Sequence, residues 1–377
     1  MARFAFISTM GGYAWGGSEE LWSRAARLLL QRGHAVAASV VGWPVDPRQL
    51  VELQRTGVEI NRRQRFQGLA TRTYNRVLRR PREDATYRWL ARFRPDLVVI
   101  SQGDAFSGVD WMLGCRSRGW RYACVVQANW EGWWAEDAIV EMVRLGYGEA
   151  ARVYFVSKRN LSLFLNQVGG PIAKAEVVSN PFTVPYRPGM MTPVNRREPF
   201  RLACVARLAP MAKGQDVLLR VLACRKWQSR PLEVGFYGEG EYADTLKRMA
   251  VALNVQHVSF KGHVKDVEEI WRQNDALVLP SRFEGTPLAL VEAMLCSRMA
   301  IVTDVGGNGE LIEDGVCGFI ARAPTVELLD EAMERAWQQR EEWPRLGEAA
   351  GLRVRACIPE DPIGHFAARL VDLHENP

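Results

Sequence analysis

DALVLPSRFEGTPLALVEAM, residues 275–294, sets a short apolar run and a run of good helix formers on either side of a Gly-Thr-Pro turn. The run at 275–281 has the length and composition of a short buried strand. Leucine, alanine, glutamate and methionine in the second run favour a helix, with Pro287 in its first turn and Thr286 as its N-cap. The stretch therefore predicts a strand that leads through a tight turn into a helix.

Two glutamates stand eight positions apart in this stretch. Glu284 falls at the predicted turn, and Glu292 falls more than one turn into the predicted helix. The N-terminus of a helix carries partial positive charge and favours anions. Two carboxylates around such an end mark the turn as a candidate binding site.

Short apolar runs alternate with helix-like runs along the rest of the chain. RFAFIS at 3–8 leads into a helix-like run at 20–33, and RLACVAR at 201–207 restarts the pattern after a break. This alternation is typical of parallel sheets with crossover helices. The break, at 180–200, carries five prolines and no periodicity, which indicates a linker. We therefore expect two doubly wound α/β domains, with a ligand site in the cleft where they face, beyond the carboxyl ends of the strands.

The composition is that of an ordinary water-soluble protein, with 377 residues of which 47% are hydrophobic and 24% charged. No apolar run approaches the roughly 18 residues that a membrane span needs. The start, MARFAFISTMGG, is better explained as a first strand than as a signal peptide. Seven cysteines are scattered without metal-binding spacing, which favours a reducing compartment. Together these features predict a cytoplasmic protein.

The stretch from Asn61 to Arg94 is strongly basic, with eleven arginines against Glu83 and Asp84. One interpretation is a solvated helix face. The other is an anionic partner, either a diphosphate-bearing acceptor or an anionic membrane touched peripherally through 62–94, at its inner face. Nucleic acid is not expected, because no recognised reading module accompanies the charge. The arginines are Arg62, Arg63, Arg65, Arg72, Arg76, Arg79, Arg80, Arg82, Arg88, Arg92 and Arg94.

Two loops at predicted strand ends carry groups suited to anions. MGGYAWGGSEE at 10–20 places paired glycines before a helix, which allows close backbone approach to a ligand or simply a tight turn. VARLAPMAKGQD at 205–216 offers Arg207 and Lys213, which can stabilise charge on a diphosphate leaving group without a metal. No Asp-x-Asp pair occurs in the chain, so no metal site is expected.

Several stretches, taken in order, resemble the family 4 glycosyltransferases, which are retaining enzymes of the GT-B fold. The resemblance covers nearly the whole chain and is strongest from 201 to 322. It implies an N-terminal Rossmann-like acceptor-side domain over 1–185, a C-terminal Rossmann-like donor domain over 186–358, and a tail helix over 359–377 that returns to the first domain. The stretches are WGGSEELWSRAARLLLQRGHAV, ARLAPMAKG, YGEGEYADTLKRMA, VSFKGHV, LPSRFEGTPLALVEAM and DVGGNGELIEDGVCGFI.

The resemblance implies a role for each matched residue of the second half. Glu284 matches the glutamate that binds hydroxyls of the transferred sugar, and Glu292 matches the one that binds the nucleotide ribose. Arg207 and Lys213 match the basic pair on the diphosphate, so the residues expected in catalysis are Glu284, Arg207 and Lys213. Backbone groups complete the donor site at Gly285, Thr286 and Leu288 for the diphosphate and sugar, and at His263 and Val264 for the base.

The first half implies a less complete set. Gly16 and Gly17 match the glycine loop under the phosphate or acceptor. Many family members carry a histidine that touches the donor sugar, whereas this chain reads YACVVQANWEGWW there, with Gln127 or Asn129 as the nearest polar substitute. Trp130, Trp133 and Trp134 follow, and they suit sugar stacking, a lipid-contacting lip or buried packing.

The resemblance implies a retaining, metal-independent transferase with no cofactor other than its nucleotide-sugar co-substrate. UDP-, GDP- and ADP-sugars stay equally open as donors, and the acceptor is a glycan, a small molecule or a lipid-linked sugar. Two other functions stay open: a sugar-nucleotide epimerase or phosphorylase-type enzyme on the same fold, and a non-catalytic glycan-binding protein. GEGEYA at 238–243 also fits a dinucleotide fingerprint, but the acidic residue expected about 20 positions later is missing.

Overall fold

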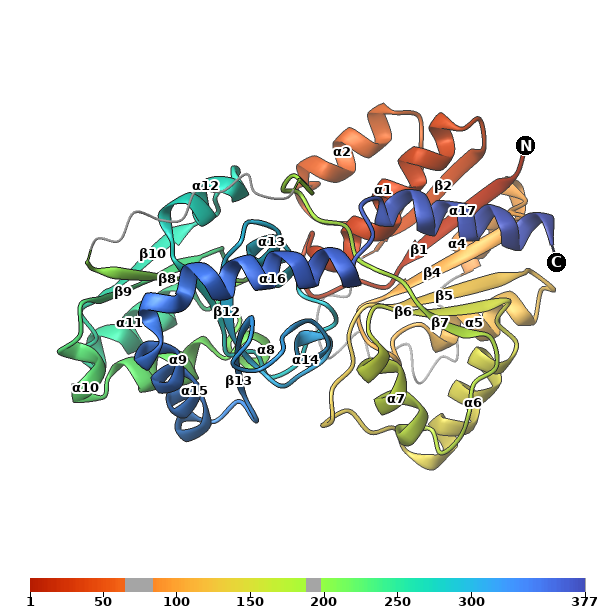
Figure 1. Cartoon of the computed structure of the whole chain (residues 1–377). Helices are drawn as coiled ribbons and strands as arrows, with labels where there is room; N and C mark the ends of the chain where they lie inside the picture. The colour runs from red at the N-terminus through yellow and green to blue at the C-terminus, as the bar shows by residue number, and fades with distance from the viewer. Residues whose placement is uncertain (65–83, 188–197, 377) are drawn as a thin grey trace. The chain divides into compact units, whose positions relative to one another are not determined.

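The computed structural model describes residues 1–64, 84–187 and 198–376 (Figure 1). The chain forms two compact units. The first unit comprises Met1–Val156, Asn160–Pro181 and Asp361–Pro377, and the second comprises Ser157–Arg159 and Phe182–Glu360. The α/β class predicted from the alternating pattern is confirmed, because each unit is built on its own parallel sheet.

Within its described residues, the first unit has a seven-stranded parallel sheet in the order β3-β2-β1-β4-β5-β6-β7. The order reverses between β1 and β4, which makes the carboxyl ends of these strands the expected ligand edge. The strands are β1 Arg3–Ser8, β2 Ala35–Val41, β3 Glu59–Arg63, β4 Leu97–Gln102, β5 Tyr122–Val126, β6 Arg152–Phe155 and β7 Ala175–Val177. The helices are α1 Gly17–Gln31, α2 Arg48–Arg55, α4 Asp84–Phe93, α5 Val109–Arg116, α6 Asp137–Gly148, α7 Lys158–Gln167 and α17 Pro362–Glu375.

Helices cover both faces of this sheet because its central strands are apolar on both sides. Along β1, Phe4 and Phe6 pack with side chains of α1 and α17, whereas Ala5 and Ile7 pack with those of α4, α5 and α6. Successive side chains of a strand point to opposite faces, so one apolar strand supplies two cores. The ligand edge is thereby held by a sheet that is packed from both sides.

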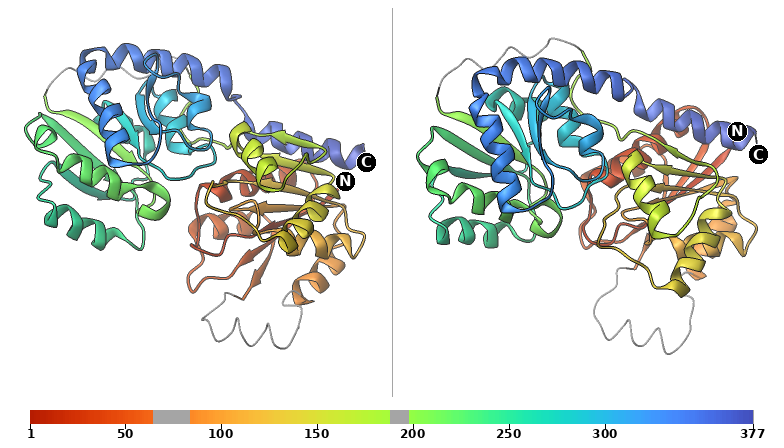
Figure 2. Two further views of the ribbon diagram at one scale, coloured as in Figure 1. Left: turned by 90° about the horizontal axis from the view of Figure 1, so that it is seen from below. Right: turned by 60° about the horizontal axis from the view of Figure 1, so that its bottom comes forward.

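The last helix, α17, belongs to the first unit. Phe366 meets the Tyr154 ring edge to face at 5.3 Å, and Arg121 donates to the carbonyl oxygen of Leu373. Figure 2 shows this helix running beside the start of the chain, where His374 lies against Phe4. Helix α17 therefore packs in the same hydrophobic core as the side chains of β1.

Within its described residues, the second unit has a six-stranded parallel sheet in the order β10-β9-β8-β11-β12-β13. The order reverses between β8 and β11, as in dinucleotide-binding sheets. The strands are β8 Phe200–Val205, β9 Leu232–Tyr237, β10 Val258–Gly262, β11 Ala276–Leu279, β12 Met299–Thr303 and β13 Gly318–Ala321. The helices are α8 Pro210–Lys213, α9 Gln215–Leu222, α10 Arg225–Gln228, α11 Ala243–Ala252, α12 Val267–Gln273, α13 Leu288–Leu295, α14 Asn308–Leu311, α15 Val326–Gln338, η1 Arg340–Glu342 and α16 Trp343–Cys357.

Two local details differ from the predictions. Helix α13 begins at Leu288, and Pro287 rather than Thr286 occupies its N-cap, where no side chain caps the helix. The predicted N-cap role of Thr286 is therefore wrong. The described start of the predicted linker packs on the second unit: Tyr186 stacks on Phe182 at 5.7 Å and donates to the carbonyl of Ile358 at 2.8 Å.

None of the helices described is long and apolar enough to cross a membrane. All seven cysteines lie in described ranges, and each is a free thiol. Most of the arginine-rich stretch does not lie in these ranges, because Arg65, Arg72, Arg76, Arg79, Arg80 and Arg82 fall outside the described residues.

Candidate functional site

An ion pair joins the segment that follows β8 to the loop that follows β11. Lys213 Nζ lies 2.6 Å from Glu284 Oε1, and the Ser281 hydroxyl donates to the same oxygen at 2.8 Å. The Glu284 side chain is 7% exposed and that of Lys213 is 22% exposed, so both charges are largely removed from water. The predicted diphosphate-binding lysine and sugar-binding glutamate therefore lie in direct contact.

The backbone conformation and the close packing at position 214 require a glycine directly after Lys213. The φ of Gly214, 63°, is left-handed, and a Cβ there would lie 1.9 Å from the Pro280 carbonyl oxygen. Only glycine tolerates both the conformation and the contact. The lysine is thus held against the loop that carries Glu284.

A second ion pair, which was not predicted from sequence, joins the same two segments. The Arg282 guanidinium donates to both carboxylate oxygens of Asp216, at 2.7 and 2.8 Å. The Arg282 amide also donates to the Ala212 carbonyl at 2.8 Å. Burial raises the pKa of Asp216, but the guanidinium outweighs it and holds this pKa below its ordinary value. Arg282 therefore positions α8, and with it Lys213.

Arg207 follows β8 directly and is half-buried. Its carbonyl oxygen accepts from the Gln215 side-chain amide at 2.8 Å, and the next residue, Leu208, donates from its backbone to the Glu239 carbonyl at 3.0 Å. The loop is therefore fixed at two points. Arg207, Lys213 and Glu284 all lie in the segments that follow the two strands where the sheet order reverses, with Lys213 at the end of α8.

Glu292 lies in α13 and is 5% exposed. Its Oε1 accepts from both the backbone amide and the hydroxyl of Thr183, at 3.0 and 2.7 Å. Thr183 comes from the stretch predicted as a linker, so sequence spacing gave no indication of this contact. The residue predicted to bind a ribose therefore has its carboxylate oriented by the segment that opens the second unit.

Backbone groups predicted in the donor site lie around the start of α13. The Gly307 amide donates to the Gly285 carbonyl at 2.6 Å, so the loop after β12 supports the Glu284 turn. Thr286 is buried, and Leu288 is the first residue of the helix. A helix leaves its first amides without an intrahelical acceptor, which suits an anion.

The predicted base-binding residues lie after the edge strand β10. His263 is exposed and Val264 is half-buried against the second core of this unit. In the first unit, Gly16 occupies the N-cap of α1 and Gly17 begins the helix. Both glycines therefore lie where the loop that follows β1 ends and α1 begins.

The hydrogen bonds distinguish Gln127 from Asn129, which the sequence left open. The Asn129 amide donates to Gln167 at 2.7 Å, and its oxygen accepts from the Trp130 backbone at 2.9 Å. Gln127 is 5% exposed, yet neither polar atom of its side chain has a hydrogen-bond partner in the described parts of the chain. The hydrogen bonds of the Asn129 side chain are thus made within the first unit, whereas the side-chain amide of Gln127 is available to bond to a ligand.

The tryptophans after this strand play different parts. Gln167 donates to the carbonyls of Trp130 and Trp133, at 2.9 and 2.7 Å, and the two rings meet edge to face at 5.9 Å. Trp134 is 68% exposed and lies outside this packing. Packing within the first unit therefore accounts for the half-buried Trp130 and Trp133 but not for the exposed Trp134.

Arg62 and Arg63, the first two arginines of the basic stretch, bond to other groups of the first unit. Arg62 pairs with Asp46 at 2.7 Å and donates to Gln54 at 2.7 Å. Arg63 donates to the carbonyl oxygens of Ser8 and Ser39. These two side chains therefore have structural partners within the first unit.

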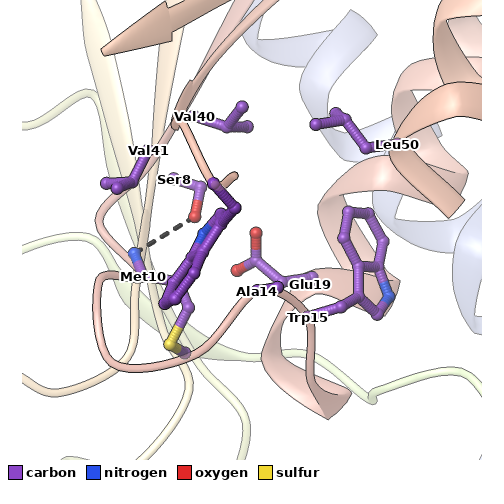
Figure 3. A pocket seen from close by; sticks show the side chains of 9 residues that line it. Ser8, Met10, Ala14, Trp15, Glu19, Val40, Val41 and Leu50 are labelled. Carbon is purple, nitrogen blue, oxygen red and sulfur yellow. Dashed lines mark hydrogen bonds between the residues drawn. The ribbon is translucent and has the colours of Figure 1, made fainter. Parts of the chain in front are cut away.

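A pocket at the ligand edge of the first sheet contains a buried carboxyl group that the sequence analysis did not select. It lies between β1, β2, α1 and α2, and Glu19 points into it (Figure 3). Glu19 is 4% exposed, and burial raises its pKa to about 7. Acidic residues are common in the first turn of a helix, so sequence alone gave no reason to single out this one.

Comparison with known proteins gives matches to both the sequence and the fold. Residues 193–353 match the family described as glycosyl transferases group 1. An uncharacterized glycosyltransferase of Methanocaldococcus jannaschii is 30% identical over 36% of this chain and 38% of its own length. A GDP-mannose-dependent α-(1-6)-phosphatidylinositol monomannoside mannosyltransferase of Mycolicibacterium smegmatis is 28% identical over 50% of this chain and 53% of its own length. The chain thus spans about half or less of these relatives.

Solved structures match over nearly the whole chain. Anabaena HepE in complex with UDP and glucose has a TM-score of 0.74 at 16% identity, covering 99% of this chain and 100% of HepE. Sucrose-phosphate synthase of Thermosynechococcus elongatus has a TM-score of 0.74 at 17% identity, covering 98% of each chain. At such identities the likeness shows the fold, which is the predicted pair of Rossmann-like domains of the GT-B architecture.

Proposed function

Because residues 193–353 match the glycosyl transferases group 1, we propose that this protein transfers a sugar from a nucleotide-sugar donor to an acceptor. This match supports, at the general level, the resemblance to family 4 glycosyltransferases. The observation that carries the proposal is the contact between Lys213 and Glu284 where the order of the second sheet reverses. A cation beside a hydrogen-bonded carboxylate suits a ligand that joins a diphosphate to a polyhydroxylated ring.

In this proposal the second unit binds the donor. Lys213 and Arg207 offset the charge that develops on the departing diphosphate, and Glu284 accepts hydrogen bonds from sugar hydroxyls. The contact between Lys213 and Glu284 orients both side chains before the donor binds, which reduces the ordering cost at binding. The amides of Gly285, Thr286 and Leu288 face the anion.

We assign binding of the donor's nucleoside to Glu292 and to the backbone of His263 and Val264. Glu292, oriented by Thr183, accepts from ribose hydroxyls. The backbone of His263 and Val264 contacts the base. Structures of HepE with UDP and UDP-glucose support a nucleotide-sugar donor, although this chain's own base and sugar stay open.

We propose that transfer proceeds with retention and without a metal. The bond from the anomeric carbon to the diphosphate breaks, and the acceptor oxygen bonds to the same face of that carbon. The acceptor's hydroxyl proton leaves with the departing diphosphate. Arg207 and Lys213 supply the positive charge that a metal ion supplies in other phosphate chemistry.

The first unit is assigned to the acceptor side, with Gly16 and Gly17 under a phosphate or the acceptor. The side-chain amide of Gln127 is buried and lacks a partner in the described chain. We propose that it contacts a hydroxyl of the donor sugar. The acceptor is a glycan, a small molecule or a lipid-linked sugar. Peripheral contact with an anionic membrane through 62–94 stays a proposal from sequence, since most of that stretch lies outside the described residues.

The test is incubation with a panel of UDP-, GDP- and ADP-sugars, with products analysed by NMR. Release of nucleoside diphosphate with a free or transferred sugar that retains its anomeric configuration supports the proposal. An epimerised sugar nucleotide would instead assign the protein to the epimerases. Binding without any turnover, with acceptor present, would assign it to non-catalytic glycan-binding proteins.

A further inference from the structure

The stretch GEGEYA at 238–243, which fits a dinucleotide fingerprint, joins β9 to α11 in the second unit. In that fingerprint the glycines let the backbone approach a bound pyrophosphate. Here a Cβ on Gly238 would lie 2.2 Å from the Ala206 carbonyl oxygen, and one on Gly240 would lie 2.3 Å from the Leu208 carbonyl oxygen. The open side of each glycine is therefore occupied by the segment that follows β8.

Hydrogen bonds hold the same two residues of that segment. The Ala206 amide donates to the Tyr237 carbonyl, and the Leu208 amide donates to the Glu239 carbonyl, each at 3.0 Å. These bonds continue the pairing of β8 with β9 beyond the end of β8. A Cβ on either glycine would force the two segments apart at this point. Gly238 also has a φ of 134°, a conformation that other residues rarely adopt.

The residue between these two contacts is Arg207. Its neighbours on both sides are bonded to β9 and the loop after it, and its own carbonyl oxygen accepts from the Gln215 side-chain amide at 2.8 Å. Gln215 is the first residue of α9 and is fully buried. The backbone of Arg207 is thus held from two directions, while its half-buried side chain is directed by that backbone.

The GEGEYA loop also contacts the segment predicted to bind the base. The Gly238 amide donates to the Gly262 carbonyl at 2.8 Å, and His263 and Val264 follow Gly262 directly. Strand β9 lies between β8 and β10 in the sheet. The loop after β9 therefore lies between the segments to which binding of the diphosphate and of the base is assigned.

We propose that Gly238, Gly240 and Gln215 are positioning residues that hold Arg207 where it meets the diphosphate of the donor. None of the three needs to touch the donor itself. The inference rests on the proposed function, since the task of Arg207 at the diphosphate belongs to that proposal. Such residues matter because a misplacement of about 1 Å can lower a rate about a hundredfold.

The test is a double-mutant cycle on nucleoside diphosphate binding, measured by calorimetry with UDP, GDP and ADP. Wild type is compared with Gly240→Ala, with Arg207→Ala and with the double variant. A residue that acts through Arg207 loses its effect once the Arg207 side chain is removed, whereas an independent residue acts equally in both backgrounds. We expect Gly240→Ala to weaken binding about tenfold in wild type and less than about twofold in Arg207→Ala.

Gly318→Ala is the matched control in the same sheet. A Cβ there would lie 2.4 Å from the Ala300 carbonyl oxygen, but at the amino ends of β12 and β13, away from the ligand edge. We expect it to lower thermal stability and to leave nucleotide binding unchanged.

Gln215→Met gives a second measurement, because it keeps much of the side-chain volume and removes the bond to the Arg207 carbonyl. We expect it to weaken binding about twofold to tenfold, again only when the Arg207 side chain is present. Thermal unfolding checks that each variant folds, and Gln215→Met replaces Gly240→Ala in the cycle if the latter does not.

Losses of equal size with and without the Arg207 side chain overturn the inference, and so does wild-type affinity in both Gly240→Ala and Gln215→Met. A wild type that binds none of the three nucleotides also overturns it. NAD is titrated in parallel, and NAD binding that Gly240→Ala abolishes would overturn it in favour of a dinucleotide site. Release of nucleoside diphosphate from sugar nucleotides is scored separately. A coupled cycle without release therefore upholds the positioning role and refutes only the proposed transfer.

Discussion

Lys213 and Glu284, 71 positions apart in the sequence, meet at 2.6 Å because β8 and β11 are neighbours in the second sheet. The side chain of Glu284 is only 7% exposed, and the same carboxylate oxygen also accepts a hydrogen bond from the Ser281 hydroxyl. Lys213→Met removes the charge and keeps most of the apolar stem. Removing one partner of a buried hydrogen-bonded pair should lower the free energy of unfolding by about 1–3 kcal/mol. Denaturant titration checks this, and an unchanged midpoint would contradict it.

Arg282 should matter for donor turnover although it is not assigned to the donor itself. Arg282→Lys loses the bidentate contact with Asp216 and loosens the turn that carries Lys213. We expect kcat/KM for the donor to fall about tenfold to a hundredfold. The matched control is Arg345→Lys, at an exposed ion pair of the same unit. Equal effects of the two substitutions would contradict the positioning role.

Thr183 should tune nucleoside diphosphate binding through Glu292. Thr183→Val removes the hydroxyl that donates to Glu292 Oε1 but keeps the backbone bond. The loss of about 0.5–1.5 kcal/mol for one hydrogen bond corresponds to roughly twofold to tenfold weaker binding by calorimetry. Thr183→Ser keeps the hydroxyl and should bind like wild type. Glu292→Ala should weaken binding more, and wild-type affinity in both Thr183→Val and Glu292→Ala would refute the ribose assignment.

Gln127 and Asn129 should respond in opposite ways. Asn129→Ala breaks the contact that holds Gln167, so we expect the unfolding free energy to fall by about 1–3 kcal/mol. Gln127→Leu replaces a buried amide that has no partner in the described residues, so stability should be unchanged or raised while transfer falls. Chemical denaturation and initial rates, measured on both variants, separate the two roles. A Gln127→Leu variant that is both destabilised and active would reverse the assignment.

Glu19 should make stability depend on pH near neutrality. Its pKa is about 7 in the folded protein against 4.5 for the ordinary group, because burial disfavours the charged form. The folded state therefore binds the proton more tightly, and stability falls as pH rises from about 4.5 through 7. A pKa difference of about 2.5 corresponds to about 3 kcal/mol.

Glu19→Gln cannot ionise, so the difference in unfolding free energy between this variant and wild type isolates the effect. We expect it to grow in favour of the variant between pH 5 and pH 8, by up to about 3 kcal/mol. Groups that titrate elsewhere in the chain contribute equally to both proteins. A difference that stays constant with pH would show that Glu19 is charged at both ends of this range.

The parallel sheets and the loops that carry Arg207, Lys213 and Glu284 could be predicted from sequence, because buried parallel strands read as apolar runs and their carboxyl-end loops follow directly. The cap of α13 could not, since Thr286 and Pro287 both suit a helix start and only backbone angles decide between them. Burial of Glu19 and the spare amide of Gln127 depend on contacts with distant segments. Local pattern carries no information about such contacts.

The assignment of Lys213 and Glu284 to a sugar-nucleotide site is tested most directly by one measurement. This is the initial rate of nucleoside diphosphate release from UDP-, GDP- and ADP-sugars, for wild type, Lys213→Met and Glu284→Gln. We predict release from at least one donor by wild type, and rates about a hundredfold or more lower in both variants. Lys213→Met loses a group that stabilises charge on the departing diphosphate, and Glu284→Gln loses the carboxylate that orients the sugar. Equal rates in all three proteins, or no release by wild type from any donor, would contradict the assignment.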